Sequence, residues 1–221
     1  KIATSYFDYF RYTNNHNSDS SNQYNYGSLQ GYKKGKLKNV LFGRPTLFNF
    51  GLDFYNSDYS DKVLIGTYYK RTAEQVTYDP WLIGQMSFEN DLDLEVGIRH
   101  HFYELDVYNK TTSKQKLHNK SSDTNAWSLG GTKKIDDKNL LNFKLSKSFR
   151  APKVDEVLHY GGAISTVEHQ NSKMFELGYK FNFDNIIIKT NAFKSEINNL
   201  IYWNGTVNDN YNPTIHEGYD V

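Results

Sequence analysis

The segment formed by residues 140–203 determines the fold that we expect. It begins LLNFKLSKSFRAP at Leu140 and, after a loop, continues MFELGYKFNFDNIIIKTNAFKSEINNLIYW from Met174. In the first arm Leu141, Phe143 and Leu145 alternate with polar residues, and the second arm alternates in the same way. Successive side chains of a β-strand point to opposite faces. Both arms therefore have an apolar face and a polar face, which predicts strands in a wall between lipid and water.

Length and composition are compatible with this prediction. The chain has 221 residues, of which 16% are aromatic, and its mean hydropathy is -0.74. A transmembrane β-barrel has a polar interior and polar loops, so a low hydropathy does not exclude it. No segment approaches the roughly 18 consecutive apolar residues that a membrane-spanning helix requires. A soluble β-sandwich of this size remains an alternative.

Charge and cysteine content exclude other classes of protein. The formal net charge is +1, and nucleic-acid-binding domains are usually strongly basic, so we expect no nucleic-acid partner. The chain contains no cysteine, which excludes disulfide bonds and thiol chemistry.

Alternation recurs upstream and divides the chain into predicted strands and loops. It is clearest at residues 46–56 and 92–107. Runs of Asn, Ser, Lys and Thr predict loops at residues 13–23 and 108–124, and Pro80 ends a third predicted loop at residues 72–80. The loops are longer at one end of the strands than at the other, as in outer-membrane barrels.

The alternation also assigns side chains to faces. We expect the following to face lipid: Phe48, Phe50, Leu52, Leu94, Val96, Phe143, Leu145, Leu177 and Tyr179. We expect the following to face the lumen: Asn49, Asp53, Asp93, Glu95, Asn142, Lys144, Glu176 and Lys180. Four aromatic residues near strand ends are candidates for the girdles that border the lipid, namely Tyr78, Trp81, Tyr202 and Trp203.

Three sequence blocks resemble a known family. They are Ser-Phe-Arg-Ala-Pro from Ser148, Glu-Leu-Gly-Tyr-Lys from Glu176, and Ala-Phe-Lys-Ser-Glu-Ile-Asn-Asn-Leu-Ile from Ala192. In this order and at this separation they resemble the end of the barrel of TonB-dependent outer-membrane receptors. The resemblance implies an antiparallel transmembrane β-barrel in the bacterial outer membrane. It further implies a transporter, not an enzyme, that imports haem or a ferric siderophore with energy from TonB.

The resemblance also implies which partners to expect. Members of the family carry a plug domain and a TonB box before the barrel, and neither is found in this sequence. The chain also ends Gly-Tyr-Asp-Val at Val221 instead of on an aromatic residue. We therefore expect residues 1–221 to be a partial barrel without the plug and the final strands. The expected partners are outer-membrane lipid, the TonB complex through the plug, the iron complex, and alternatively a host iron protein.

The loop at residues 153–172 contains the candidate ligand-binding residues His159, Tyr160 and His169. Imidazole and phenolate side chains both bind iron in haem proteins. The resemblance adds that haem importers place a histidine between the Phe-Arg-Ala-Pro block and an Asn-Pro-Asn-Leu block. His159 lies in that interval, although Asn-Pro-Asn-Leu is absent and Val167-Glu168-His169-Gln170 stands where the family has Leu-Lys-Pro-Glu. The alternative is a loop of solvated histidines, and we expect no intrinsic cofactor or metal site.

No catalytic motif is found in the sequence. Gly-x-Ser-x-Gly, His-Glu-x-x-His and a phosphate-binding glycine loop are all absent. His100 and His101 are adjacent, so on a strand only one of them faces the lumen. We interpret the pair as structural, and an outer-membrane barrel enzyme with an Asp/His site at the edge of the lumen remains a further alternative.

Overall fold

The computed structural model describes residues 4–18, 22–63, 69–110, 115–158, 164–183 and 186–221. Within these ranges the chain is almost entirely β-strand. The strands are β1 (Thr4–Ser18), β2 (Asn22–Leu41), β3 (Arg44–Val63), β4 (Tyr69–Phe88), β5 (Leu92–Asn109), β6 (Gln115–Lys134), β7 (Asn139–Arg150), β8 (Gln170–Phe183), β9 (Ile186–Asn198), β10 (Leu200–Trp203), β11 (Asn208–Tyr211) and β12 (Thr214–Asp220). Between β7 and β8 lies one helical turn, α1 (Val154–Val157). No helix in the described part of the chain is long and apolar enough to cross a membrane.

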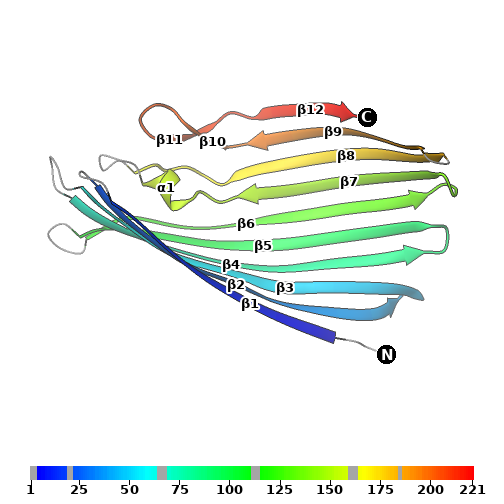
Figure 1. The fold of residues 1–221 in the computed structure, drawn as a ribbon, viewed down its shortest axis with the longest axis horizontal. Coiled ribbons are helices and arrows are strands. Elements are labelled where there is room, and N and C mark those ends of the chain that lie inside the picture. The colour runs from blue at the N-terminus through cyan, green and yellow to red at the C-terminus, as the bar shows by residue number, and fades with distance from the viewer. Residues whose placement is uncertain (1–3, 19–21, 64–68, 111–114, 159–163, 184–185) are drawn as a thin grey trace.

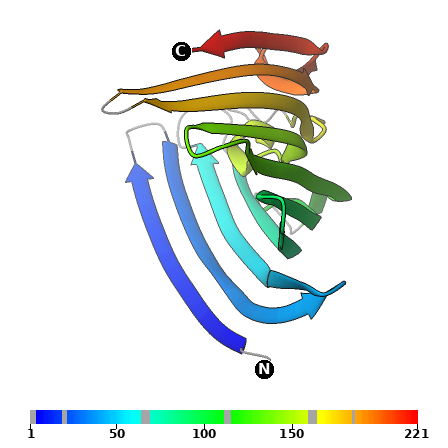
Figure 2. The ribbon, with the colours of Figure 1, turned by 90° about the vertical axis from the view of Figure 1, so that its right-hand side faces the viewer.

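Ten of the strands form one continuous antiparallel sheet. Its order is β1-β2-β3-β4-β5-β6-β7-β8-β9-β12, and β10 pairs separately with β11. The strands lie side by side along their length (Figure 1). Viewed from the end of the strands, the sheet bends into an open arc with β1 and β12 at its two free edges (Figure 2). The prediction of an antiparallel barrel wall is thereby confirmed, and the sheet is not the two-layered sandwich considered as an alternative.

The two ends of the sheet have different connections. At one end β2 and β3 are joined through Phe42 (φ 51°) and Gly43 (φ 75°), the two positive φ angles of a tight hairpin turn. At the other end β7 and β8 are separated by residues 151–169. Strands β2, β3, β4 and β6 each have 20 residues, whereas about 9–11 residues cross a membrane. The strands are thus long enough to extend beyond the lipid at the end of the long connection.

Three predicted loops proved wrong, because most of their residues belong to strands. Residues 72–80 lie inside β4, and most of 13–23 and 108–124 belong to the strands that flank them. Outside the lipid the two faces no longer separate lipid from water, so apolar and polar residues stop alternating. In β4, for example, the polar Gln75 and Thr77 are buried on the same side as Ala73. Pro80 keeps its place opposite Leu52 of β3, whereas on the other side the β4–β5 pairs stop at Tyr78↔Phe102 and resume at Trp81↔Arg99. The ladder is thus interrupted where proline has no N–H to donate.

The predicted division into two faces is confirmed by the register. Asp93 and Glu95 lie on the side of β5 that continues to the buried Tyr103, whereas Val96 is 52% exposed on the other side. Apolar side chains of neighbouring strands share that second side: Phe143 and Leu94 both approach Gly131, and Phe48 approaches Gly84. Large exposed apolar residues gather there, including Leu52, Leu82, Ile98, Leu145, Phe175 and Leu177. We call this side the convex face, and we expect lipid to cover it because its large apolar side chains would otherwise be exposed to water.

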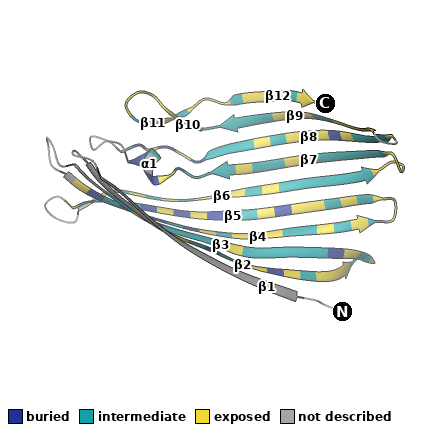
Figure 3. Cartoon of the chain, viewed as in Figure 1, coloured by how far each residue is buried: buried dark blue, intermediate teal, exposed yellow. Residues whose placement is uncertain are grey.

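The hydrophobic core lies at the end of the sheet that carries the long connection. Ala73 of β4 and Tyr103, Leu105 and Val107 of β5 are almost fully buried there. They pack against residues of the β7–β8 connection, which are Val154, Val157, Leu158 and Val167. Buried positions accordingly concentrate around α1 and the adjacent ends of the strands (Figure 3). The described parts of the connection, residues 151–158 and 164–169, are therefore folded onto the concave face of the wall.

Candidate functional site

A row of charged side chains lines the concave face between the hydrophobic core and the short turns. Asp53 of β3 accepts hydrogen bonds from Arg99 of β5 and from the indole N–H of Trp81, whose Nε1 is 3.2 Å from Oδ1. Arg99 Nη1 also lies 3.6 Å from Asp79 Oδ2. The Trp81 ring covers Gly51, where a Cβ atom would come within 2.7 Å of it. The girdle prediction is therefore wrong for Trp81, which points inward because Asp53 and Gly51 provide a partner and a space for its ring.

Asp79 links this row to a buried histidine. Its Oδ1 lies 2.5 Å from Nδ1 of His101, whose side chain is 6% exposed. The neighbouring His100 instead lies on the convex side, where its ring contacts Phe102 at 4.4 Å between centroids. The expectation that only one of the two histidines faces inward is confirmed. A carboxylate bound to Nδ1 fixes the orientation of an imidazole and leaves Nε2 for another partner.

His169, at the end of the β7–β8 connection, meets His101. The centroids of the two rings are 5.7 Å apart and the rings are nearly perpendicular. Ser122 Oγ of β6 lies 3.4 Å from Nδ1 of His169. Burial first, and then the neighbouring His101 and Lys120, lower the pKa of His169 to about 4, so its imidazole is neutral at pH 7. The structure thus brings a wall histidine and a loop histidine together.

The Ser-Phe-Arg-Ala-Pro block anchors the start of the connection. The Phe149 ring lies 4.7 Å from the ring of His101. Arg150 Nη1 donates to both carboxylate oxygens of Glu156, at 2.8 and 2.7 Å, and Glu156 also accepts the backbone N–H of Lys153 at 2.9 Å. The Pro152 carbonyl accepts a hydrogen bond from Tyr103 Oη at 3.3 Å. Through these contacts the block shapes the exit of the strand.

The β10–β11 hairpin holds the connection from the other side. Asn210 accepts the backbone N–H of Glu168 at 2.6 Å and donates to its carbonyl oxygen at 3.3 Å. Asn208 Nδ2 donates to the carbonyl oxygen of Glu156 at 3.0 Å, and Ile201 joins the hydrophobic core. On the wall side, Lys120 donates to the Val167 carbonyl and lies 3.3 Å from Glu168. The connection is therefore held between the wall and the hairpin.

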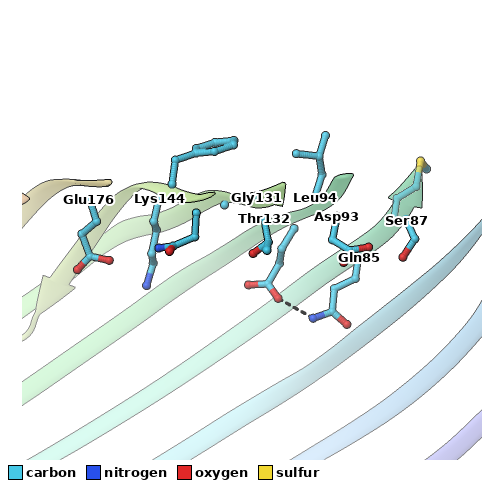
Figure 4. A pocket seen from close by; sticks show the side chains of 13 residues that line it. Gln85, Ser87, Asp93, Leu94, Gly131, Thr132, Lys144 and Glu176 are labelled. Atoms are coloured by element: carbon cyan, nitrogen blue, oxygen red, sulfur yellow. Dashed lines mark hydrogen bonds between the residues drawn. The ribbon is translucent and has the colours of Figure 1, made fainter. Parts of the chain in front are cut away.

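A polar pocket lies on the concave face, at the end of the sheet that carries the short turns. It has a volume of about 540 Å³, and its polar lining includes Asp93, Glu95, Thr132, Lys144 and Glu176. Gln85 donates a hydrogen bond of 2.6 Å to Glu95. Figure 4 shows Gln85, Thr132, Lys144 and Glu176 pointing to one side of the sheet and Leu94 to the other. This pocket confirms that the predicted lumen-facing residues share one polar surface.

The structure describes only one of the three predicted ligand-binding residues. His159 and Tyr160 lie outside the described residues, so their role stays a prediction. His169 is described and is 6% exposed. Sequence reasoning did not connect it with His101, which lies 68 positions earlier on β5, because only the inward fold of the connection brings the two together. In the described part of the chain no cluster of three or more His, Asp or Glu side chains is arranged to hold a metal ion.

Comparison with known proteins agrees with this architecture. Residues 2–220 match the family described as "TonB dependent receptor-like, beta-barrel". Because the match covers nearly the whole sequence, the chain belongs to this family of TonB-dependent receptor barrels. Proteins of this family are receptors of the bacterial outer membrane. No curated protein sequence matches the chain.

Three solved structures illustrate the similarity of the fold. The hemophore receptor HasR of Serratia marcescens, in complex with its hemophore HasA and heme, has a TM-score of 0.72 at 13% identity, over 99% of this chain and 42% of its own. The ferric yersiniabactin uptake receptor FyuA of Yersinia pestis has a TM-score of 0.68 at 10% identity, over 98% of this chain and 36% of its own. The alcaligin receptor FauA of Bordetella pertussis has a TM-score of 0.66 at 15% identity, over 97% of this chain and 39% of its own. The chain thus spans about two fifths of the length of these receptors, and identities this low establish a common fold only.

Proposed function

We propose that the receptor to which this chain belongs imports a scarce iron complex, either haem or a ferric siderophore, across the bacterial outer membrane. The observation that carries the proposal is the family match over residues 2–220. Structural neighbours named for heme and for ferric yersiniabactin support iron as the cargo. In this proposal the described strands form part of the wall. Energy from the TonB complex reaches the receptor through a plug segment outside this chain, and the iron complex is the substrate of transport.

The β7–β8 connection is the segment that we propose contacts the iron complex. Its described parts are held in place by the ion pair between Arg150 and Glu156 and by the hydrogen bond from Glu168 to Asn210. His159 and Tyr160 lie within this connection, and their imidazole and phenolate groups are suitable ligands for haem iron. His169, at the end of the connection, is buried against the wall, so we assign direct contact with the cargo to the other two residues.

A receptor for a protein that carries iron is the second candidate. The observation in its favour is that HasR is described in complex with its hemophore. Strands of 20 residues extend beyond the span of the lipid and so provide an extended outer surface for such a partner. An enzymatic role has less support, because the Asp79–His101 pair is buried beneath the connection.

Uptake measurements test the proposal. A strain lacking the receptor is complemented with the wild-type gene, and uptake of iron-labelled haem and of ferric siderophores is measured with and without TonB. We expect uptake of one class of complex that requires both the receptor and TonB. Equal uptake in the TonB-deficient strain would contradict energy-coupled import. If only a protein-bound form of the iron supports uptake, the second candidate replaces the first.

Substitutions in the connection identify the contact with the cargo. For a haem importer, replacing His159 or Tyr160 with alanine should reduce haem binding by the purified receptor at least tenfold. His118→Ala is a suitable control, because His118 lies on β6 outside the connection. Undiminished binding by both connection variants would remove these residues from the proposed site while leaving TonB-dependent import intact.

A further inference from the structure

Among the described residues, three buried imidazole nitrogen atoms have no hydrogen-bond partner: Nε2 of His101, of His118 and of His169. The rings of His101 and His169 meet on the concave face. Taken as whole residues, His101 is 4% and His169 is 6% exposed, so both are more than nine-tenths buried. The centroids of their rings are 5.7 Å apart. A buried polar atom without a partner costs free energy unless a water molecule or an ion satisfies it. Two such atoms on adjoining rings indicate a shared partner between the wall and the connection.

The opposite ring nitrogen atoms are already engaged. Nδ1 of His101 is 2.5 Å from Asp79 Oδ1, and Nδ1 of His169 is 3.4 Å from Ser122 Oγ. In metal sites a histidine ligand usually gives its other ring N–H to a carboxylate or another polar group, which fixes the tautomer and makes the ligand more basic. The Asp79–His101 arrangement has this form, with Nε2 as the nitrogen that remains for an ion.

Aromatic rings and paired charges surround the two imidazoles. Aromatic rings of Tyr103 and Phe149 lie 5.4 Å from His169 and 4.7 Å from His101 between centroids. Of the nearby charged groups, Asp79 binds Arg99 as well as His101, and Lys120 is paired with Glu168. Neutral imidazole is the form that binds copper, zinc and nickel, and carboxylate-rich sites instead suit calcium and magnesium.

We propose that His101 and His169 form a two-imidazole site for a divalent transition-metal ion of the copper, zinc and nickel group, with water completing the coordination. The ion would join β5 to the end of the β7–β8 connection and so stabilise the connection in its inward position. The site is separate from the iron complex that the receptor carries, and it does not depend on the identity of that cargo. A two-ligand site agrees with the absence of any cluster of three or more ligands among the described side chains.

Copper(II) is the probe for the test, because it binds imidazole most strongly among these ions and reports nitrogen ligands by electron paramagnetic resonance. The full receptor is purified in detergent, freed of metal with a chelator and titrated with copper(II). We expect the wild-type spectrum to contain a component with two imidazole nitrogens. In His101→Gln and in His169→Gln this component should be lost, and Asp79→Asn should weaken its affinity about 10- to 100-fold.

Two controls make the result decisive. His100→Gln changes the adjacent histidine on the convex face, and it should keep the two-imidazole component at the same affinity. Folding of every variant is checked by the shift in gel mobility that an intact barrel shows on heating. The proposal is overturned if the folded His101→Gln and His169→Gln variants bind copper with the same affinity and spectrum as the wild type, or if the wild type shows no two-imidazole component. Either result would assign the two nitrogen atoms to a buried water molecule.

Discussion

The hydroxyl group of Tyr103 on β5 donates a hydrogen bond to the carbonyl oxygen of Pro152, 3.3 Å away in the β7–β8 connection. The two residues are 49 positions apart in the sequence and both are buried. The bond therefore joins the wall to the first residues of the connection at the point where Ser-Phe-Arg-Ala-Pro ends.

Removing this hydrogen bond should loosen the connection. Tyr103→Phe leaves the Pro152 carbonyl without its partner, at a cost of about 0.5–1.5 kcal/mol. Opening of the connection should become roughly 2- to 10-fold more frequent, and tryptic cleavage at the exposed Lys153 should accelerate by the same factor. Phe102→Leu, on the convex face, is the control and should not change the cleavage rate. Identical rates for Tyr103→Phe and wild type would show that the hydrogen bond does not hold the connection.

The ion pair between Arg150 and Glu156 is expected to stabilise α1. Both side chains are partly exposed, so we expect a loss of about 0.5–1 kcal/mol in Glu156→Gln. The Leu158 amide, which donates to the Val154 carbonyl at 2.8 Å, should exchange its hydrogen about 2- to 5-fold faster. The exchanged pair Arg150→Glu with Glu156→Arg should recover part of the protection. If the double variant exchanges faster than the single one, the attraction between the two charges is not the cause.

The outer end of the β5–β6 pair should depend on pH. Burial alone would raise the pKa of Asp106, but hydrogen bonds from Lys116, Asn119 and Tyr108 hold it below its usual value. A carboxyl group with a lowered pKa in the folded state adds stability above its unfolded pKa, about 3.9, and loses it as the pH falls through the folded value. Protection of the amides near Asp106, measured against the intrinsic exchange rate at the same pH, should therefore fall below about pH 4. Asp106→Asn should remove this pH dependence, and a variant that retains it would point to another carboxyl group.

The sequence predicted the wall much better than it predicted the site. Alternation identified strands and faces wherever one side meets lipid and the other water, as at Leu94 and Glu95, because those two environments select opposite side chains. It failed at residues 72–80 and 108–124, where the strands no longer separate lipid from water. There β4 buries the polar Gln75 and Thr77 beside Ala73, and Pro80 resembles a strand terminator. The meeting of His101 with His169 depends on tertiary packing of the connection, which no local pattern encodes. Trp81 was misassigned because its partners, Asp53 and Gly51, lie on another strand.

A charge on the convex face should destabilise the receptor far more than one on the concave face. Val96 is 52% exposed on the convex side, and an arginine in the middle of the lipid costs about 2–4 kcal/mol. Val96→Arg should lower the free energy of unfolding in phospholipid vesicles by about this amount. Glu95→Arg, one position away on the polar side, should change it by less than about 1 kcal/mol. Equal losses in the two variants would be inconsistent with the assigned faces.

Spin labels at Val96 and Glu95, compared in the intact receptor within a lipid bilayer, test the placement of this chain in the outer-membrane wall most directly. Molecular oxygen dissolves in lipid, whereas a polar nickel chelate remains in water. We predict that oxygen relaxes the label at position 96 more strongly and that the nickel chelate relaxes the label at position 95 more strongly. Reversed accessibility, or access of the nickel chelate to both positions, would contradict a wall whose convex face meets lipid.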